Sequence, residues 1–520
     1  MTPAKILTPS ATPNRAPIPA PSRQNHPDDG KSERGDTRAW LCLWFLAGTL
    51  FIITLLAGFM REGMFIDGIV YAAIAKNLSL NQGSVWDPFY STTHFAHFYE
   101  HPPLVFYLQS GLFRLLGPDS PAERVYNALV ALLQFALIAF YWLTQGRRMG
   151  AASATLPWSS ISWLLCLWLL IPLNYLYTSN MLECTLTLFT TLAGLMLLVN
   201  TRSISSTLIT TACSACAMMV AFLCNGPCAF FPLAIPWLKA WIVQKNNHHH
   251  VLAESVLLTG LLGLAFVIFY ALVPNAWINT THYLHEQLAA SLSGDRGTRF
   301  TGFAHMHIIV LYMRAYWPVA GITLLVNFVA KRPLRQMMNR CGLLLLAVSL
   351  VASLPVGISP RQAFNYIMPS APFATLAAMI WSYPAILRLM QRLSSSRVLQ
   401  TKALWLCCSI FIISLIGVSV QRMCAKPNLM LRDVLQLRHN LPQHSVVSVD
   451  SELFYAWYTG AYFARFSSIS ITPEPGRRHY LGFKNHPLPA AYRAITRPHD
   501  DYFQLGRLRR TLQIPTNQLR

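Results

Sequence analysis

The chain has 520 residues, of which 53% are hydrophobic and only 12% are charged. A mean hydropathy of +0.38 excludes an ordinary soluble globular protein of this length, so the sequence predicts an integral membrane protein. The net charge of +21 does not by itself indicate a nucleic-acid partner, because basic residues in a membrane protein first report its topology. No nucleic-acid partner is expected.

Residues 1–38 are rich in Pro, Ser, Thr and charge, and they contain no aromatic side chain. Such a segment cannot bury enough apolar surface to fold, so we predict a disordered cytoplasmic tail. The apolar stretch that follows begins too late, and is too long, for a signal peptide.

Eleven apolar stretches of 15 to 24 residues follow. A helix needs about 20 residues to cross about 30 Å of hydrocarbon. The stretches predict an α-helical polytopic membrane domain over residues 39–420, with about 11 transmembrane helices. The expected spans are Ala39–Met60, Tyr126–Thr144, Ser160–Tyr177, Leu182–Asn200, Ser205–Cys224, Ala229–Val243, Val251–Val273, His307–Ala330, Cys341–Val356, Tyr366–Leu389 and Ala403–Val420.

The basic residues alternate between the two sets of connections. Six precede the first span, and four more lie between the eighth and ninth spans, at Lys331, Arg332, Arg335 and Arg340. The short connections of the opposite set hold almost none, with Arg361 alone before the tenth span. Because cytoplasmic loops carry the excess of Lys and Arg, we predict a multi-pass protein of the bacterial inner membrane, with a cytoplasmic N-terminus and a periplasmic C-terminal domain.

The first exported connection, residues 61–124, is longer than a connector needs to be, and long loops often carry function. Its apolar residues recur at i, i+4 and i+8, namely at Val70, Ile74 and Leu78. This spacing predicts a helix lying in the membrane interface, with Asp67 in its first turn, where a carboxylate is favourable. A second helix is predicted from Pro102 through Leu116, because Pro is tolerated in a first turn.

Residues 421–520 are predicted to form a small exported α/β domain. Strand-like segments at 445–449 and 467–471 are followed by a turn signal at Pro473 to Gly476. This segment contains more basic than acidic residues. It is therefore interpreted either as a solvated exported domain or as one attracted to anionic lipid head groups, and the sequence leaves both open.

Acidic residues are scarce in the chain, with twenty in all, and three stand at the exported ends of spans: Asp67, Glu100 and Glu183. A membrane enzyme that transfers a group to a hydroxyl or amine needs one carboxylate as general base, and Asp67 fits that role. A phosphate leaving group needs cations, for which the exported candidates are Arg61, Lys76, Arg296, Arg299 and Arg361.

Glu100 and His101, with His282 or His285 of the second exported connection, offer ligand types that suit a divalent cation. Solvated histidines are common near an interface, so a metal cofactor is left open. No nucleotide-binding motif is present, which indicates that the energy for any transfer comes from the substrate.

Four stretches, in order, resemble the GT-C glycosyltransferases related to protein O-mannosyltransferases and to the lipid A aminoarabinose transferase. They are Phe65–Asn77 with Asp67, Tyr99–Leu104, Asn180–Phe189 with Glu183, and Ser359–Pro369. The resemblance implies a GT-C-like fold over about residues 40–420. It also implies a glycosyltransferase that takes its sugar from a polyprenyl-phosphate donor and transfers it, with inversion, to a lipid, glycan or protein acceptor.

Carried onto this sequence, the resemblance implies Asp67 as catalytic base and Glu183 as a second acidic site residue. It implies Glu100 and His285 as metal ligands and places Arg361 at the donor phosphate. The predicted substrate-binding residues of these motifs are Tyr71, Lys76, His101, Arg361 and Tyr366. Two departures are visible. Asn225 stands where the family often shows Lys before Gly-Pro, and His101 and Arg361 stand where Lys is frequent.

Two other classes of function remain as alternatives. A transporter or flippase of lipid-linked sugars should place ionisable residues in the middle of spans and often shows repeated halves, neither of which is evident here. A membrane scaffold that binds a partner through its C-terminal domain would leave the polar first connection unexplained.

Overall fold

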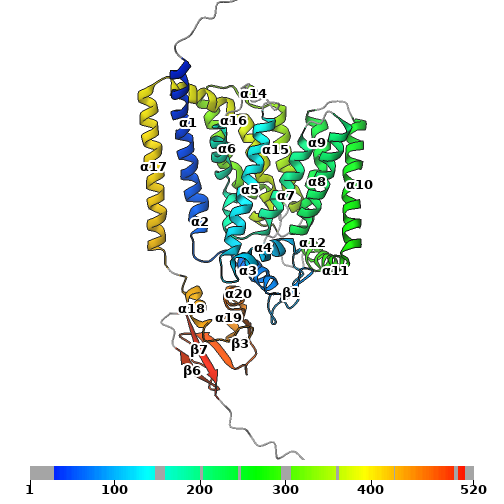
Figure 1. The fold of residues 1–520 in the computed structure, drawn as a ribbon, viewed down its shortest axis with the longest axis vertical. Coiled ribbons are helices and arrows are strands. Elements are labelled where there is room, and N and C mark those ends of the chain that lie inside the picture. The colour runs from blue at the N-terminus through cyan, green and yellow to red at the C-terminus, as the bar shows by residue number, and fades with distance from the viewer. Residues whose placement is uncertain are drawn as a thin grey trace, which may run out of the picture.

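The computed structural model describes residues 29–146, 158–199, 203–243, 248–293, 306–358, 362–426, 428–496 and 502–509. A long helical bundle makes up most of the molecule, and a small mixed α/β domain sits against one end of it (Figure 1). We call this end of the bundle the domain end. The chain is a multi-pass membrane protein, as its composition predicts.

Eight helices of the described residues are long and apolar enough to cross a membrane. The pair α6 and η2 (Ser160–Leu169 and Pro172–Thr178), bent by 84°, makes a ninth if it is one span. The eight are Thr37–Phe59 (α1, η1 and α2), Ala122–Gln145 (α5), Ile204–Ile242 (α8, η3 and α9), Val251–Leu272 in α10 (His248–Leu272), His307–Val329 (α13), Arg340–Ile358 (α15 and η6), Phe364–Ser394 (η7 and α16) and Arg397–Cys424 (α17).

The expected number of about eleven spans exceeds these eight or nine for two reasons. α7 (Leu182–Leu198) is an apolar helix of only 17 residues, at the lower limit for crossing a bilayer. The 39-residue run Ile204–Ile242 contains two of the expected spans, divided by a break at Gly226 between α8 (Ile204–Asn225) and η3 (Gly226–Ala234). The total of eleven therefore stays a prediction.

The first helix begins earlier than expected. α1 (Asp29–Phe51) includes ten residues that we had predicted to belong to a disordered tail. Helix propagation explains the difference, because a helix nucleated in an apolar span extends at low cost into residues such as Lys, Glu and Arg. The rest of the predicted tail, residues 1–28, lies outside the described residues.

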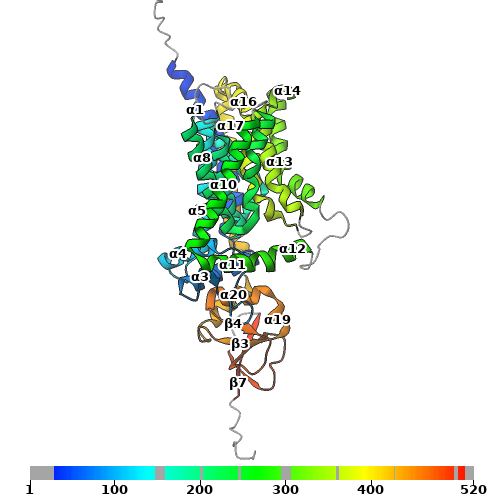
Figure 2. The same ribbon diagram turned by 90° about the vertical axis from the view of Figure 1, so that its right-hand side faces the viewer.

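Short helices cover the domain end of the bundle. The two helices predicted in the first connection are confirmed as α3 (Ile66–Ser79) and α4 (Leu104–Leu116). Between them lies a two-residue hairpin, β1 (Gly83–Ser84) with β2 (Asp87–Pro88). The second long connection contributes α11 (Pro274–His282), η4 (Tyr283–Ala289) and α12 (Ala290–Ser293), which lie across the bundle in Figure 2.

The C-terminal domain is built on a five-stranded mixed sheet of order β4-β3-β5-β7-β6. β3 pairs in parallel with β4 and β5, whereas β7 pairs antiparallel with β5 and β6. The predicted strands near 445 and 470 are confirmed. The elements are α18 (Leu429–Leu437), β3 (Val446–Val449), α19 (Ser451–Tyr455), α20 (Trp457–Ser467), β4 (Ser470–Thr472), β5 (His479–Phe483), β6 (Tyr492–Thr496) and β7 (Phe503–Leu508).

A buried ion pair joins this domain to the first turn of α5. Arg465 of α20 donates to the Glu123 carboxylate at 2.9 Å, and the side chains are 1% and 5% exposed. The guanidinium also donates to the carbonyl oxygens of Pro118 and Ser120, and it lies 4.7 Å from the ring centre of Phe113. Because a buried charge is tolerated only with such partners, these contacts hold the domain in one position.

Candidate active site

Asp67 stands in the first turn of α3, at the domain end of the bundle, with its side chain exposed. The helix begins after Phe65, whose extended backbone (ψ 145°) turns the chain into Ile66. The free N–H groups of a first helical turn favour a carboxylate there. The local sequence therefore explains why the acid lies at the start of the helix, where it faces outward.

The first turn of α3 is locked against the loop that precedes α7. Asn180 donates from its amide to the Gly68 carbonyl at 2.7 Å, and its side-chain oxygen accepts from Gln109 at 2.8 Å and from Asn127 at 2.6 Å. A Cβ on Gly68 would lie 2.0 Å from the Ser179 carbonyl oxygen, so only glycine permits this approach. One buried asparagine thus joins α3, α4, α5 and the start of α7.

This junction brings Asp67 near Glu183, in the first turn of α7. Glu183 is only 4% exposed, and its carboxylate accepts from the Asn365 amide at 2.7 Å. The side chain of Asn225 also interacts with it, and the charge of Asp67 acts on it electrostatically. Two carboxylates predicted from separate motifs are therefore brought together from segments more than 100 residues apart.

Tyr71, one turn after Asp67 on α3, lies at the centre of the site. Its hydroxyl makes a hydrogen bond of 3.1 Å with Nε2 of His101, and the two rings pack edge to face. Burial raises the pKa of Tyr71 well above its usual value, and electrostatic interactions with Asp67, Glu183, Tyr366 and Glu100 raise it further. Asp67, Glu100, His101, Glu183 and Tyr366 therefore all interact with the phenol of Tyr71, which stays protonated. We call these five residues, together with Tyr71, the acidic site.

Tyr283 of η4 extends the acidic site toward the second connection, and the sequence did not single it out. Gly226, at φ +76°, has no room for a side chain, because a Cβ there would lie 2.1 Å from the Tyr283 hydroxyl oxygen. Burial raises the pKa of Tyr283, with Cys228, Tyr366 and Glu183 adding to the shift. The Asn-Gly-Pro run at 225–227 therefore has two functions in the site. Gly226 lets the Tyr283 hydroxyl come close to the backbone, and the Asn225 side chain interacts with Glu183.

The predicted metal ligands are not assembled into a metal site. The Glu100 carboxylate accepts from Gln287 at 3.0 Å, and His285 is exposed on η4. His282 instead binds Glu286 at 2.8 Å. Within the described ranges, no group of three or more His, Cys, Asp or Glu side chains could hold a metal ion. The roles of Glu100 and His285 as ligands stay a prediction, and the reaction proposed below uses no metal step.

Two predicted substrate-binding residues, Arg361 and Tyr366, lie just before and at the start of the tenth expected span. Tyr366, in η7 (Phe364–Ser370), interacts electrostatically with both Tyr71 and Tyr283. Its neighbour Asn365 holds Glu183, a role that sequence reasoning missed. Arg361 lies outside the described residues, so its predicted place at a donor phosphate is untested.

Lys76 does not join the acidic site, and its predicted contact with substrate stays a prediction. It lies nine residues after Asp67 on α3, or about 13 Å along the helix at about 1.5 Å per residue. Its ammonium is buried and donates to the carbonyl oxygens of Ala464 and Arg465 at 3.2 and 2.6 Å. These carbonyls belong to the last turn of α20, where intrahelical partners run out. Lys76 thus caps a helix of the C-terminal domain.

We expect this contact to make stability depend on pH. Burial, followed by the charge of Arg465, lowers the pKa of Lys76 from 10.5 to about 7. Between these two values the unfolded chain binds a proton that the folded chain has lost, so stability rises with pH over that range. The midpoint of thermal unfolding should therefore rise from pH 7 to pH 9, and Lys76→Met should flatten the rise.

Lys426→Met is the matched control, because the Lys426 side chain is exposed. Its pH dependence should equal that of the native protein. The explanation is wrong if the midpoint of thermal unfolding rises with pH equally in Lys76→Met and in the native protein.

Comparisons with known proteins identify the fold. No protein-family model matches the sequence, and no curated protein sequence matches it. The solved structure of ArnT from Cupriavidus metallidurans bound to undecaprenyl phosphate superposes with a TM-score of 0.59 at 14% identity, over 89% of this chain and 97% of that one. Its apo structure gives 0.58 at 15% identity, over 90% and 96%.

The archaeal oligosaccharyltransferase AglB from Archaeoglobus fulgidus, in complex with an inhibitory peptide and a dolichol-phosphate, gives a TM-score of 0.51 at 10% identity. The match covers 86% of this chain and 69% of that one. The fold is thus shared with ArnT and AglB, and the predicted resemblance to GT-C glycosyltransferases is confirmed at the level of fold. ArnT and AglB are two particular proteins that share it, with this chain covering nearly all of ArnT.

Proposed function

We propose that this protein is a membrane glycosyltransferase that takes a sugar from a polyprenyl-phosphate donor and transfers it, with inversion, to an acceptor at the domain end. The observation that carries the proposal is the acidic site, in which Asp67, Glu100 and Glu183 meet around Tyr71. The fold also supports the proposal, because the structures of ArnT and AglB, which share this architecture, were solved with undecaprenyl phosphate and with a dolichol-phosphate respectively.

In the proposed reaction, Asp67 takes the proton from an acceptor hydroxyl or amine as that atom attacks the anomeric carbon. The bond from the anomeric carbon to the phosphate oxygen breaks, and its electrons leave with the polyprenyl phosphate. Attack from the face opposite the phosphate inverts the configuration. Asp67 suits the base because it is exposed, whereas Glu183 is buried and held by Asn365.

The remaining roles follow from position. The hydrogen bond between Tyr71 and His101 fixes the orientation of a phenol that can donate to substrate. Tyr366, in η7, interacts electrostatically with Tyr71 and is assigned to the donor together with Arg361. A guanidinium suits a phosphate because it can form paired hydrogen bonds with it. Residues 39–420 form the catalytic domain in this proposal, and 421–520 form the exported domain. The N-terminus is cytoplasmic, in a bacterial inner membrane.

The test is transfer by the purified full-length protein in lipid nanodiscs. Polyprenyl-phosphate sugars carrying a radiolabel in the sugar are supplied with lipid, glycan and peptide acceptors, and the label remaining on the prenyl lipid is measured. A glycosyltransferase moves the label to an acceptor and leaves unlabelled polyprenyl phosphate. A transporter or flippase leaves the label on the lipid, as does a scaffold, and that result in all acceptor arms would overturn the proposal.

A further inference from the structure

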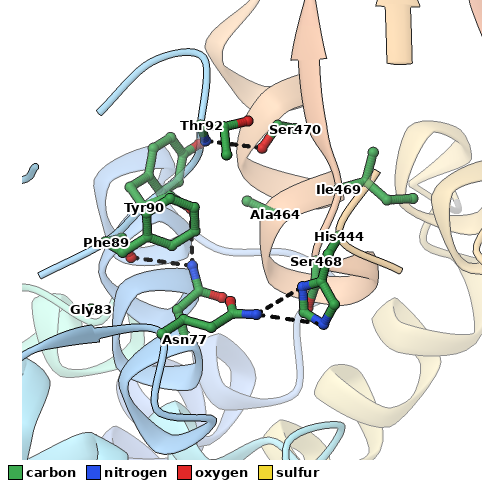
Figure 3. A pocket seen from close by; sticks show the side chains of 11 residues that line it. Asn77, Gly83, Phe89, Tyr90, Thr92, His444, Ala464, Ser468, Ile469 and Ser470 are labelled. Atoms are coloured by element: carbon green, nitrogen blue, oxygen red, sulfur yellow. Dashed lines mark hydrogen bonds between the residues drawn. The ribbon is translucent and has the colours of Figure 1, made fainter. Parts of the chain in front are cut away.

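A cavity lies between the first connection and the C-terminal domain, away from the acidic site. Its volume is about 310 Å³, near the lower end of the range of about 300–1,000 Å³ that is usual for small-ligand pockets. Figure 3 shows Phe89, Tyr90 and Thr92 on one wall and His444 and Ser470 on the other. We call it the interdomain cavity, and its lining is Asn77, Gln82, Gly83, Phe89, Tyr90, Thr92, His444, Ala464, Ser468, Ile469 and Ser470.

The lining of the interdomain cavity mixes apolar and polar surface, and the apolar part is the larger. None of its eleven residues is Asp, Glu, Lys or Arg. An ionic ligand would therefore meet no opposite charge, whereas amides and hydroxyls can both donate and accept hydrogen bonds. The rings of Phe89 and Tyr90 add apolar surface of the kind that packs against a flat, partly apolar molecule. This combination fits an uncharged polyhydroxylated ligand.

Asn77 supplies a hydrogen-bond acceptor that the protein leaves unused. Its side chain is only 2% exposed, and its amide nitrogen donates to the carbonyl oxygens of Phe89 and Tyr90 at 3.2 and 2.9 Å. Its side-chain oxygen, buried in the cavity lining, accepts no hydrogen bond from any residue that the structure describes. Buried polar atoms nearly always have a partner, so an unpaired oxygen at a cavity wall points to a ligand hydroxyl that donates to it.

Side chains from the two parts of the chain close the interdomain cavity. The amide of Gln82 binds a ring nitrogen of His444 at 2.8 Å, across its two walls. The backbone N–H of Thr92 donates to the Ser470 hydroxyl at 3.1 Å. The cavity is therefore a property of the docked domain, because neither part alone supplies both walls.

The interdomain cavity and the acidic site lie at opposite ends of one helix. Asn77 follows Asp67 by ten residues on α3, which is about 15 Å along the axis. A single free sugar cannot reach both sites, whereas an acceptor with several sugar units can. We propose that the interdomain cavity binds a neutral sugar unit of a glycan acceptor while another part of that acceptor reaches Asp67. This inference rests on the proposed function.

Direct binding, measured without any donor, tests this proposal separately from transfer. Full-length protein in nanodiscs is examined by saturation-transfer NMR with neutral methyl glycosides of glucose, mannose, galactose and N-acetylglucosamine and with neutral disaccharides. At least one of these saccharides should bind the native protein. Thr92→Trp should abolish the binding, because a bulky ring at the rim fills the cavity, and Gln82→Ala should weaken it about tenfold, as loss of one hydrogen bond would.

Matched controls are Thr93→Trp, one residue outside the lining, and Gln436→Ala, an exposed glutamine of α18. Both should bind as the native protein does, and so should Asp67→Asn, which tests the proposed function alone. The midpoint of thermal unfolding of each variant shows that it is folded, and Gln82→Ala decides the matter if Thr92→Trp is unstable. The proposal is overturned if no saccharide binds, if both cavity variants bind normally, or if an uncharged glycine-serine tetrapeptide binds the cavity instead.

Discussion

An Asp67→Asn variant is expected to transfer sugar about 10²- to 10⁴-fold more slowly than the native protein, the usual contribution of a general base. The amide keeps the size of the carboxylate and can still accept hydrogen bonds, but it cannot take a proton from the acceptor. Loss of the charge at the first turn of α3 should cost only about 0.3–1 kcal/mol of stability. Initial rates of label transfer from the prenyl lipid measure the effect.

Asp119→Asn is the matched control, because Asp119 belongs to the same connection and its side chain is 71% exposed. Its nearest cation is Arg438, at 3.8 Å, so the substitution removes one surface charge and leaves the acidic site intact. It should transfer at the native rate. An Asp67→Asn protein that transfers as fast as Asp119→Asn would exclude Asp67 as the base.

A Gly68→Ala variant is expected to lose about 1–3 kcal/mol of stability, the cost of inserting one methyl into a filled space. The added Cβ would lie 2.0 Å from the Ser179 carbonyl oxygen and 3.0 Å from Cβ of Asn180. The start of α3 must therefore move away from the loop before α7, which breaks the hydrogen bond from Asn180 to the Gly68 carbonyl. Because that junction holds Asp67 near Glu183, the transfer rate should fall together with the midpoint of thermal unfolding.

Gly111→Ala provides the control for this substitution. Gly111 lies in α4, and an added Cβ there would meet no atom within 4 Å. Alanine in a helix is favoured over glycine by about 0.5–1 kcal/mol, so this variant should be at least as stable as the native protein. If Gly68→Ala and Gly111→Ala have the same midpoint of thermal unfolding and the same transfer rate, the tight junction between α3 and the loop before α7 is not needed for the site.

Local patterns predicted the helices of the first connection and the strands of the C-terminal domain. α3 was predicted from apolar residues at a spacing of four, and α4 from a proline at a helix start, because both signals depend on neighbours in the sequence. Asp67, Glu100 and Glu183 could be named as site residues because acids are rare in an apolar chain. All three act electrostatically on Tyr71, and their roles in a site stay predictions.

The residues that position the site could not be predicted in this way. Asn180, Asn365 and Tyr283 act through partners more than fifty residues away, which no local pattern reports. A weak signal existed for Asn180, because asparagine tolerates the left-handed backbone that it adopts here, at φ 56°. Lys76 was singled out by its charge and by its place in the first motif, and neither signal reports that its ammonium binds carbonyl oxygens of α20.

The docking of α20 also imposes an order of assembly. Its contacts with Lys76 and Glu123 join positions that are 342 to 389 residues apart in the sequence. A nascent chain leaves the ribosome N-terminus first. The side chains of Lys76 and Glu123 therefore stay hydrated until nearly all the polypeptide, including α20, has been synthesised. Desolvation of the ammonium and the carboxylate is therefore a late maturation step, and a prematurely terminated product that lacks α20 keeps both groups hydrated and never acquires the second wall of the interdomain cavity.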